Sequence, residues 1–230
     1  MPELPEVETI VRDLQSKLKG KIIKDFSCDR PKLLNFPVAK LKQKIVNLSV
    51  KSVKRRAKMI IIDLTEDLSL LIHLKMTGQL ILRGKSGRYA GGGHPIAQHL
   101  KELPNQFTHA VFSFSDGQLL FFNDVRLFGY IKLMPTKEIE PLFQKKKLGP
   151  EPLSSDFTLA KFQEMVTMRK TSKIKPLIMD QSFIAGIGNI YADETLHYAC
   201  INPARIDGFI KQAELKKLHE GIKKILNERN

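Results

Sequence analysis

The stretch HAVFSFSDGQLLFFND, residues 109–124, carries the strongest indication of the fold in this chain. It consists of two alternating, largely apolar runs, His109–Ser115 and Gln118–Asn123, with Asp116-Gly117 between them, and this pattern predicts a β-hairpin. Further apolar runs of strand length lie on both sides of it: Ile45–Val53, Met59–Leu64, Leu68–Leu74, Gln79–Leu82 and Tyr130–Met134. Together these runs predict an antiparallel β-sandwich or flattened barrel.

Helical periodicity frames this region of strands. Before Gly20, apolar residues recur at three- and four-residue spacing, which predicts a leading helix; they are Val7, Ile10, Val11, Leu14 and Leu18. The helical period returns over Phe157–Met168, Ile174–Gln181, Ile190–Ala199 and Phe209–Asn227. We therefore predict an α+β protein with an N-terminal antiparallel β-sandwich domain over residues 1–134, a linker over residues 135–152, and an all-α domain over residues 153–230.

The segment from Gly84 to Gln106 shows neither period. It is rich in glycine, with three in succession at Gly91–Gly93, and it also contains Pro95 and Pro104. Because glycine and proline interrupt regular structure, this segment predicts a long mobile loop between strands.

The charge balance indicates a polyanionic partner. The chain has 38 Lys and Arg against 24 Asp and Glu, a formal net charge of +14, and the surplus is concentrated in the first half. Basic side chains gain affinity for nucleic acids by neutralising phosphates and releasing counterions, although a merely solvated basic surface is the alternative. No apolar run approaches about 18 residues and no leader opens the chain, so a membrane span and secretion are disfavoured. The two cysteines, Cys28 and Cys200, are too few for a disulfide framework or a four-thiolate zinc site, which favours a reducing compartment.

The opening residues Met1-Pro2-Glu3-Leu4-Pro5-Glu6 combine a candidate nucleophile with two carboxylates. If Met1 is removed, Pro2 becomes an N-terminal secondary amine. An α-amino group titrates near about 7.7–8 and lysine near about 10.4, so far more of the terminal amine is neutral at pH 7. Such an amine forms an iminium with an aldehyde carbon, and Glu3 and Glu6, one helical turn apart, are candidate proton shuttles. The alternative is that Pro and Glu are ordinary first-turn residues of a helix.

A basic run, Lys54–Lys58, precedes the strand predicted at Met59–Leu64. Alternation along an extended chain places Arg56 and Lys58 on one face, where they are suited to phosphate contacts. A solvated charge run explains the same residues equally well.

Two further segments carry candidate contacts to bases. Met76, within His73–Gly78, has the character of a wedge between bases, although a core methionine is more frequent. In Asp124–Gly129, Arg126 and Phe128 share a face if the chain is extended, so that one could hydrogen-bond an orphaned base while the other stacks. A turn with a buried phenylalanine is the alternative.

The segment Ala185–Glu194 places two glycines and Asn189 ahead of a predicted helix, and backbone N–H groups at such a start are suited to binding a phosphate. It is not a dinucleotide-binding fingerprint, because Tyr191 stands where the third glycine belongs and no strand precedes it. Upstream, Arg169–Lys175 adds a cluster of cations that includes Lys170.

Taken in order, six motifs closely resemble formamidopyrimidine-DNA glycosylase, the bacterial enzyme that removes oxidised purines such as 8-oxoguanine. The motifs are Pro2–Thr9, Arg55–Lys58, His73–Gly78, Asp124–Gly129, Leu148–Pro152 and Ala185–Glu194. The resemblance extends from the terminus to about residue 203. It implies a β-sandwich followed by a helical domain with a helix–two-turn–helix element, in agreement with the α+β prediction. The related endonuclease VIII enzymes share the scaffold but typically have Gly where this chain has Leu4.

The resemblance implies catalytic roles for individual residues. Pro2 matches the nucleophile that attacks the sugar C1′ and carries the Schiff base. Glu3 matches the proton donor for base loss and sugar ring opening, and Lys58 the proton donor for β-elimination. Glu6 remains the second candidate carboxylate from the residue pattern alone.

The resemblance also implies contacts to DNA. Met76, Arg126 and Phe128 match the trio that fills the gap left by the flipped nucleotide. Arg126 is also among the residues at DNA-contacting positions, together with His73, Lys170 and Asn189.

The family normally continues beyond this length with a lesion-contacting loop and a four-cysteine zinc finger whose arginine assists δ-elimination. This chain stops at Asn230 without them, so we expect either a truncated chain or a natural variant, and no zinc or other cofactor within it. The expected partner is double-stranded DNA with an oxidised base or an abasic site. We expect a monomer that is bacterial, cytoplasmic and nucleoid-associated, with no membrane partner.

These observations lead to one principal hypothesis and two alternatives. The principal hypothesis is a bifunctional DNA glycosylase and abasic-site lyase for oxidised purines, acting in base excision repair through an N-terminal proline Schiff base and β-elimination. The first alternative is an endonuclease VIII-like glycosylase for oxidised pyrimidines. The second is a non-catalytic remnant that binds damaged DNA. This alternative is considered because the lesion-contacting loop and the zinc finger of the family are missing.

Overall fold

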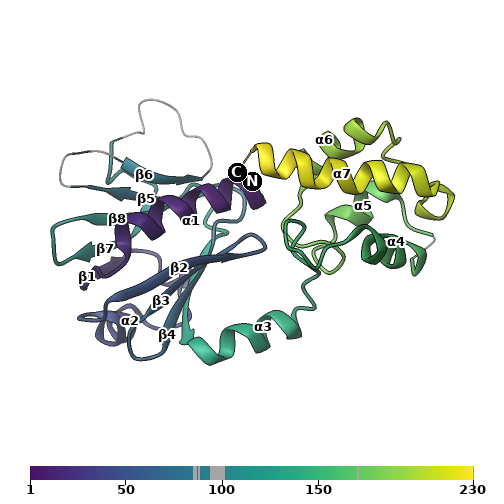
Figure 1. Ribbon diagram of the computed structural model, residues 1–230. Coiled ribbons are helices and arrows are strands. Elements are labelled where there is room, and N and C mark those ends of the chain that lie inside the picture. The colour runs from purple at the N-terminus through teal and green to yellow at the C-terminus, as the bar shows by residue number, and fades with distance from the viewer. Residues whose placement is uncertain (85–86, 88, 94–101, 170, 230) are drawn as a thin grey trace. The chain divides into compact units, whose positions relative to one another are not determined.

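The computed structural model describes residues 1–84, 87, 89–93, 102–169 and 171–229. The chain divides by its internal contacts into two compact units, one of Met1–Pro2 with Glu6–Pro141 and one of Glu3–Pro5 with Leu142–Asn230. Each unit has its own cluster of buried apolar side chains. The strands belong to the first unit and helices α4 to α7 to the second (Figure 1).

The first unit is a sandwich of two antiparallel sheets, which confirms the predicted architecture (Figure 1). One sheet has the order β1-β7-β8-β5-β6, with bounds Ile23–Cys28, Thr108–Phe114, Leu119–Asp124, Gly78–Arg83 and Tyr89–Gly93. The other has the order β2-β3-β4-β9, with bounds Val50–Arg56, Met59–Leu64, Leu68–His73 and Tyr130–Pro135. The hairpin predicted at Asp116-Gly117 joins β7 to β8, and Gly117 adopts the positive φ, 85°, that such a turn favours.

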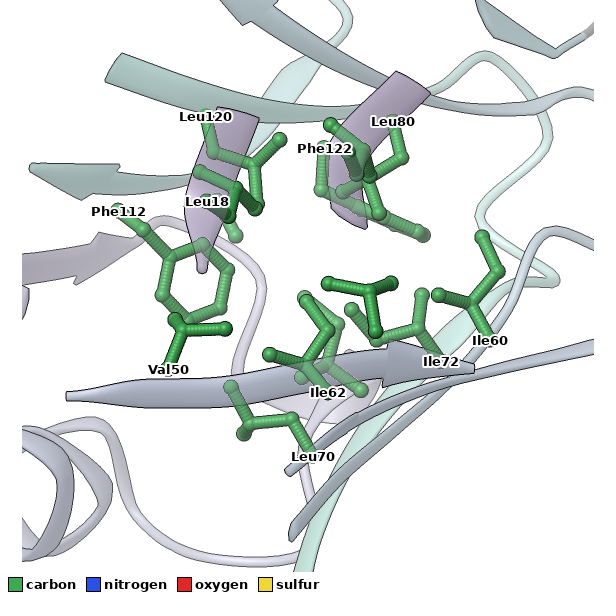
Figure 2. Packing of buried hydrophobic residues seen from close by; sticks show 14 of the residues in the cluster. Leu18, Val50, Ile60, Ile62, Leu70, Ile72, Leu80, Phe112, Leu120 and Phe122 are labelled. Carbon is green, nitrogen blue, oxygen red and sulfur yellow. The ribbon is translucent and has the colours of Figure 1, made fainter. Parts of the chain in front are cut away.

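The core of the sandwich is built from alternate residues of the facing strands. Figure 2 shows Leu80, Phe112, Leu120 and Phe122 of one sheet opposite Val50, Ile60, Ile62, Leu70 and Ile72 of the other. Each of these side chains is at most 2% exposed. The side chains that enter this core are two residues apart along a strand, as Ile60 and Ile62 are in β3, and this is the period of a strand, although all six residues of β3 are buried.

Helix α1 (Leu4–Leu18) is the leading helix that the sequence predicted, and its apolar stripe lies in this same core. Its polar side chains reach strands at the ends of both sheets. The Asp13 carboxylate accepts a hydrogen bond from the Gly91 N–H of β6 at 3.2 Å, and the Gln15 side-chain oxygen accepts one from the Val53 N–H of β2. Because β6 and β2 are terminal strands, the helix satisfies backbone donors that a sheet edge otherwise leaves open.

Among the described residues of the first unit, strands β1 and β6 and helix α2 (Val38–Ile45) were not predicted. Strand β6 lies within the range predicted as a loop, and its glycines are required there, since a Cβ on Gly91 would stand 2.3 Å from the Leu80 carbonyl oxygen. The predicted strand at Ile45–Val53 is wrong in its first half, because α2 ends at Ile45 and β2 begins only at Val50.

The second unit is helical, as predicted. Helices α4 (Leu159–Thr167), α5 (Ile174–Met179), α6 (Asn189–Ala199) and α7 (Gln212–Glu228) enclose its core. An unpredicted helix, α3 (Ile139–Lys145), occupies part of the range 135–152, and the boundary between the units falls within it. Among the described residues, no helix combines the length and apolar character needed to traverse a lipid bilayer.

A buried carboxylate stabilises the second sheet. Asp63 on β3 is 7% exposed and accepts hydrogen bonds from Ser52 Oγ at 2.8 Å, Lys54 Nζ at 2.6 Å and Ser69 Oγ at 2.8 Å. Burial by itself raises the pKa of Asp63, but the hydrogen bonds from Lys54, Ser52 and Ser69 outweigh it and hold the pKa below its usual value.

We expect Asp63→Asn to lower the free energy of unfolding at pH 7 by about 1–3 kcal/mol, because an amide cannot accept all three bonds. A carboxylate whose pKa is lowered by folding contributes stability above its unfolded pKa, about 3.9, and loses that contribution as the pH falls through the folded pKa. The difference between wild type and variant should therefore shrink from pH 7 to pH 3 in urea unfolding. Asp67→Asn, at a carboxylate that is 92% exposed, is the matched control. A difference in the free energy of unfolding that is the same at pH 7 and pH 3 would contradict the stabilising role of the ionised Asp63.

Candidate functional site

The N-terminal residues differ sharply in exposure. Met1 is 45% exposed, whereas Pro2 is buried and Glu3 is 2% exposed. While Met1 is attached, the Pro2 nitrogen belongs to a peptide bond and has no nucleophilic lone pair, so any chemistry at Pro2 requires removal of Met1.

The Glu3 carboxylate caps helix α6, 185 residues away in sequence. Its Oε2 accepts hydrogen bonds from the N–H groups of Gly188 at 2.7 Å and Tyr191 at 3.4 Å, and its Oε1 accepts one from Ile190 at 3.0 Å. The N-cap residue of α6, Gly188, has no side chain to do this. These donors therefore bind a carboxylate of the chain itself, in place of the external phosphate that the sequence suggested.

Close packing beside this cap fixes the segment Glu3–Pro5. The Leu4 N–H donates to the Gly186 carbonyl oxygen at 3.1 Å, and the Leu4 side chain is fully buried. Gly186 has a φ of 91°, and a Cβ there would stand 2.7 Å from Leu4 Cδ1. Glycine at position 186 is thus required both by the backbone conformation and by the approach of Leu4.

Glu6 lies in the first turn of α1 and is half-buried. An acidic side chain is favourable there because of the helix dipole. Helix α1 begins at Leu4, so Glu3 precedes the helix and its carboxylate is directed to α6. The two carboxylates that the sequence placed one helical turn apart therefore stand in different local environments.

Lys58 lies in a two-residue turn, Ala57-Lys58, that joins β2 to β3. The pair Arg56 and Met59 closes the turn, Ala57 has a φ of 53°, and Lys58 is only 7% exposed. The sequence interpretation that put Arg56 and Lys58 on one strand face is wrong, because the chain reverses between them. A non-glycine residue in the left-handed region costs energy that the surroundings must offset.

Arg55 supplies much of that support. Its Nη1 donates to the Ala57 carbonyl oxygen at 2.9 Å, and its Nε donates to Glu8 Oε2 on α1 at 2.7 Å. Arg12 Nε donates to the other Glu8 oxygen at 3.0 Å. The turn that holds Lys58 is thus tied to the leading helix.

His73 stands at the end of β4, beside the strand that follows Lys58. Its Nδ1 accepts a hydrogen bond from the Lys75 N–H at 2.9 Å, so the neutral ring carries its proton on Nε2. Tyr130 packs against the imidazole with ring centroids 5.6 Å apart, and burial raises the pKa of Tyr130, which keeps the phenol protonated at neutral pH.

Met76, Arg126 and Phe128 come from two loops of the first unit, and Arg126 contacts both of the others. Arg126 Nη1 lies 3.2 Å from Met76 Sδ, and the Arg126 guanidinium lies 4.8 Å from the centre of the Phe128 ring. Met76 is 42% exposed and Phe128 53% exposed, so neither is the core residue that the alternatives envisaged. Arg126 and Phe128 meet through a turn, in which Leu127 has a φ of 57°, and not through the extended chain considered from the sequence.

Sequence reasoning missed two members of this exposed group. Val125 and Leu127 are 46% and 42% exposed and alternate with Arg126 and Phe128 along the same turn. Exposed apolar side chains that gather on one loop mark a contact surface. The signal available in the sequence was the run VRLF directly after a strand.

The second unit contributes the remaining candidates. Asn189 is exposed as the first residue of α6. Nearby, Lys175 Nζ is 2.7 Å from an Asp193 carboxylate oxygen, so that cation is already paired. Lys170 lies outside the described residues.

The four-cysteine zinc site that the resemblance implies for the family does not fit the residues present. Of the chain's two cysteines, Cys28 belongs to the first unit and Cys200 to the second. Within the ranges that the structure describes, no three His, Cys, Asp or Glu side chains are grouped to hold a metal ion.

Two family models match this chain along most of its length. The formamidopyrimidine-DNA glycosylase N-terminal domain matches residues 1–131, and the formamidopyrimidine-DNA glycosylase H2TH domain matches residues 148–229. Among similar proteins, the formamidopyrimidine-DNA glycosylase of Pelotomaculum thermopropionicum is 42% identical over 99% of this chain and 77% of its own length. That of Desulforamulus reducens is 38% identical over the same shares.

Solved structures of formamidopyrimidine-DNA glycosylases are also similar to this chain. A complex between Lactococcus lactis Fpg and DNA containing an abasic site superposes with a TM-score of 0.85 at 32% identity, over 98% of this chain and 77% of that one. A complex of the wild-type Lactococcus lactis protein with DNA containing an oxidised pyrimidine gives a TM-score of 0.86 at 33% identity, over 99% and 79%.

Proposed function

Since the chain belongs to the formamidopyrimidine-DNA glycosylase family, DNA glycosylases of base excision repair, we propose that it excises oxidised purines from double-stranded DNA and then cleaves the resulting abasic site. The proposed nucleophile is Pro2 after removal of Met1, with Glu3 and Lys58 as proton donors. Glu6 is the further candidate carboxylate. The assignments of Pro2, Glu3 and Lys58 rest on the family resemblance and on the chemistry of the residue, whereas that of Glu6 rests on the residue pattern alone.

The proposed chemistry begins at the sugar. The Pro2 nitrogen attacks C1′, the bond from C1′ to the base breaks, and the departing base takes up a proton from the Glu3 carboxyl group. The Glu3 carboxylate then removes the proton that the Pro2 nitrogen still carries and delivers it to the ring oxygen, so that the sugar ring opens and an iminium forms between Pro2 and C1′. The iminium acidifies the C2′ proton, whose removal expels the 3′ phosphate by β-elimination, and water then hydrolyses the imine. Lys58 is the proposed proton donor for this elimination, and δ-elimination is not part of the proposal.

The observation that supports this proposal most strongly is the fixation of Glu3. The residue directly after the proposed nucleophile is 2% exposed, and three backbone N–H groups, from the N-cap and the first turn of α6, hold its carboxylate. A proton donor is effective only where its position is fixed relative to the reacting atoms. The alternative of an ordinary first-turn glutamate does not describe Glu3, because Glu3 precedes α1 and its carboxylate is directed to α6.

The proposed DNA contacts come from both units. Met76, Arg126 and Phe128 are exposed, and Arg126 contacts both of the others. Residues that replace a flipped nucleotide must be exposed, and their insertion offsets an unstacking cost of about a few kcal/mol. His73, with its proton on Nε2, and Asn189, exposed at the start of α6, are suited to phosphate oxygens. Lys170 is retained as a proposed phosphate contact from the resemblance.

Excision assays on matched duplexes test the substrate class. We expect 8-oxoguanine and formamidopyrimidine to be released at least about tenfold faster than thymine glycol, since a pocket built for one base edge rejects another by a kcal/mol or more. Faster release of thymine glycol than of 8-oxoguanine would support the oxidised-pyrimidine alternative. The complex of the Lactococcus lactis protein with DNA containing an oxidised pyrimidine is the reason to test this alternative. Binding to an abasic duplex without release of any base would support the non-catalytic alternative.

A further inference from the structure

We propose that Asp124 and Thr77 are positioning residues that lock together the two loops carrying Met76, Arg126 and Phe128, and so set the efficiency with which a paired lesion is extruded. This inference rests on the proposed function, because it assumes that these three side chains enter the DNA. It assigns no chemical step to either residue.

Asp124 is the last residue of β8 and is completely buried. Its carboxylate accepts three hydrogen bonds from two loops. Oδ1 accepts a short one from the Thr77 hydroxyl and one from the Arg126 N–H at 3.2 Å, and Oδ2 accepts one from the Gly129 N–H at 2.7 Å. One side chain therefore holds the loop before β5 and both ends of the turn between β8 and β9.

Thr77 completes the connection. Its hydroxyl donates to Asp124 and also accepts a hydrogen bond from the Arg126 N–H at 3.0 Å. The backbone of Arg126 is thus bound to both side chains, and the hydroxyl must donate and accept at once. Serine can do this, whereas valine, which has the same shape as threonine, can do neither.

The fit around Gly129 shows how closely the loop is held. A Cβ at this position would stand 3.1 Å from the Asp124 carboxylate, 2.9 Å from the His73 carbonyl oxygen and 2.8 Å from the Phe122 ring. The chain after the turn is therefore pressed against both the carboxylate and the end of β4. Loops fixed in this way do not have to be ordered when DNA binds.

The carboxylate of Asp124 cannot be replaced by an amide without loss of a hydrogen bond. All three of its partners are donors, so one of them would face the NH2 group of an asparagine and lose its acceptor. The exposed ends of the loops would stay on the surface, but the distance from Met76 to Arg126 would no longer be fixed. Extrusion of a stacked base requires that fixed arrangement, whereas a site that has already lost its base does not.

The test compares two substrates in the variants Asp124→Asn, Thr77→Val and Thr77→Ser. One duplex carries a paired 8-oxoguanine and the other a preformed abasic site, each cleaved in a single turnover. Asp63→Asn is the matched control, since it is also a buried carboxylate bound by hydroxyl groups in the same sandwich.

We expect Asp124→Asn and Thr77→Val to lose about tenfold or more on 8-oxoguanine and less than about threefold on the abasic site, with Thr77→Ser close to wild type. The control should change both rates equally or not at all. Equal losses on the two substrates in Thr77→Val, or no loss on either, would overturn the proposal.

A binding measurement separates this inference from the proposed chemistry. A 2-aminopurine next to the lesion gains fluorescence when its neighbour is unstacked, whether or not cleavage follows. If wild type unstacks the duplex but does not cleave it, the proposed chemistry fails. The positioning role then stands if the fluorescence gain is smaller with Thr77→Val than with Thr77→Ser, and fails if the two gains are equal. If wild type produces no fluorescence change, the positioning role fails whatever the cleavage rates.

Discussion

Glu3→Gln is expected to slow release of an oxidised base by about 100-fold or more, the usual contribution of a positioned general acid. The amide has nearly the shape of the acid but no proton to give. Cleavage at a preformed abasic site should fall less, because the base has already gone. Single-turnover release of 8-oxoguanine and cleavage of an abasic duplex, measured side by side, give the two rates.

The same substitution has a structural consequence that must be measured separately. Gln presents one acceptor oxygen to the N–H groups of Gly188, Ile190 and Tyr191, where Glu3 presents two. We expect a loss of about 1–3 kcal/mol in the free energy of unfolding. Binding to a duplex with a stable abasic analogue shows whether the variant is still folded. A folded Glu3→Gln that releases the base at the wild-type rate would remove Glu3 from the mechanism.

Retention of Met1 is expected to abolish strand cleavage, with a loss on the order of 1000-fold or more, because an amide nitrogen cannot form an iminium. One preparation divided in two, with and without treatment by a methionine aminopeptidase, differs only at this residue. The fraction of chains that begin at Pro2, measured by intact mass, should equal the fraction active in a single-turnover burst.

Pro2→Gly complements this comparison. It keeps an N-terminal amine but makes it primary, and it removes a ring that is buried in the structure. We expect cleavage to fall by about tenfold or more without vanishing, since a primary amine still forms an imine. Full activity in the form that retains Met1 would contradict the role of Pro2, whatever Pro2→Gly shows.

Much of the fold was predictable because buried strands and helices leave a period in the sequence. Strand β3 coincides with the predicted run Met59–Leu64, and α6 begins one residue before the predicted Ile190. Strand β1 escaped because only Ile23 and Phe26 of its six residues are buried, and they are three apart across a bulge. Strand β6 escaped because its glycines are selected by close backbone contact, which leaves no hydrophobic pattern.

The candidate site was predictable in composition but not in arrangement. The motifs identified Glu3 and the start of α6 separately, yet nothing local connects residues 185 apart, and only the fold reveals that one caps the other. Lys58 lies in a turn because Ala57 has a positive φ. Alanine rarely adopts a positive φ, so the sequence did not indicate this turn. Asp124 looked like part of a motif, and its three bonds to two loops became visible only in the structure.

The most direct test of the mechanism is to locate the covalent bond to DNA. Borohydride reduces an iminium to a stable amine, so protein incubated with an abasic duplex and borohydride can be digested with trypsin and mapped by mass spectrometry. After loss of Met1 the first peptide, residues 2–12, contains no lysine, and its only amine is that of Pro2. We predict that the sugar remnant is found on this peptide. A remnant on a lysine elsewhere, such as Lys58, with residues 2–12 unmodified would contradict the central claim.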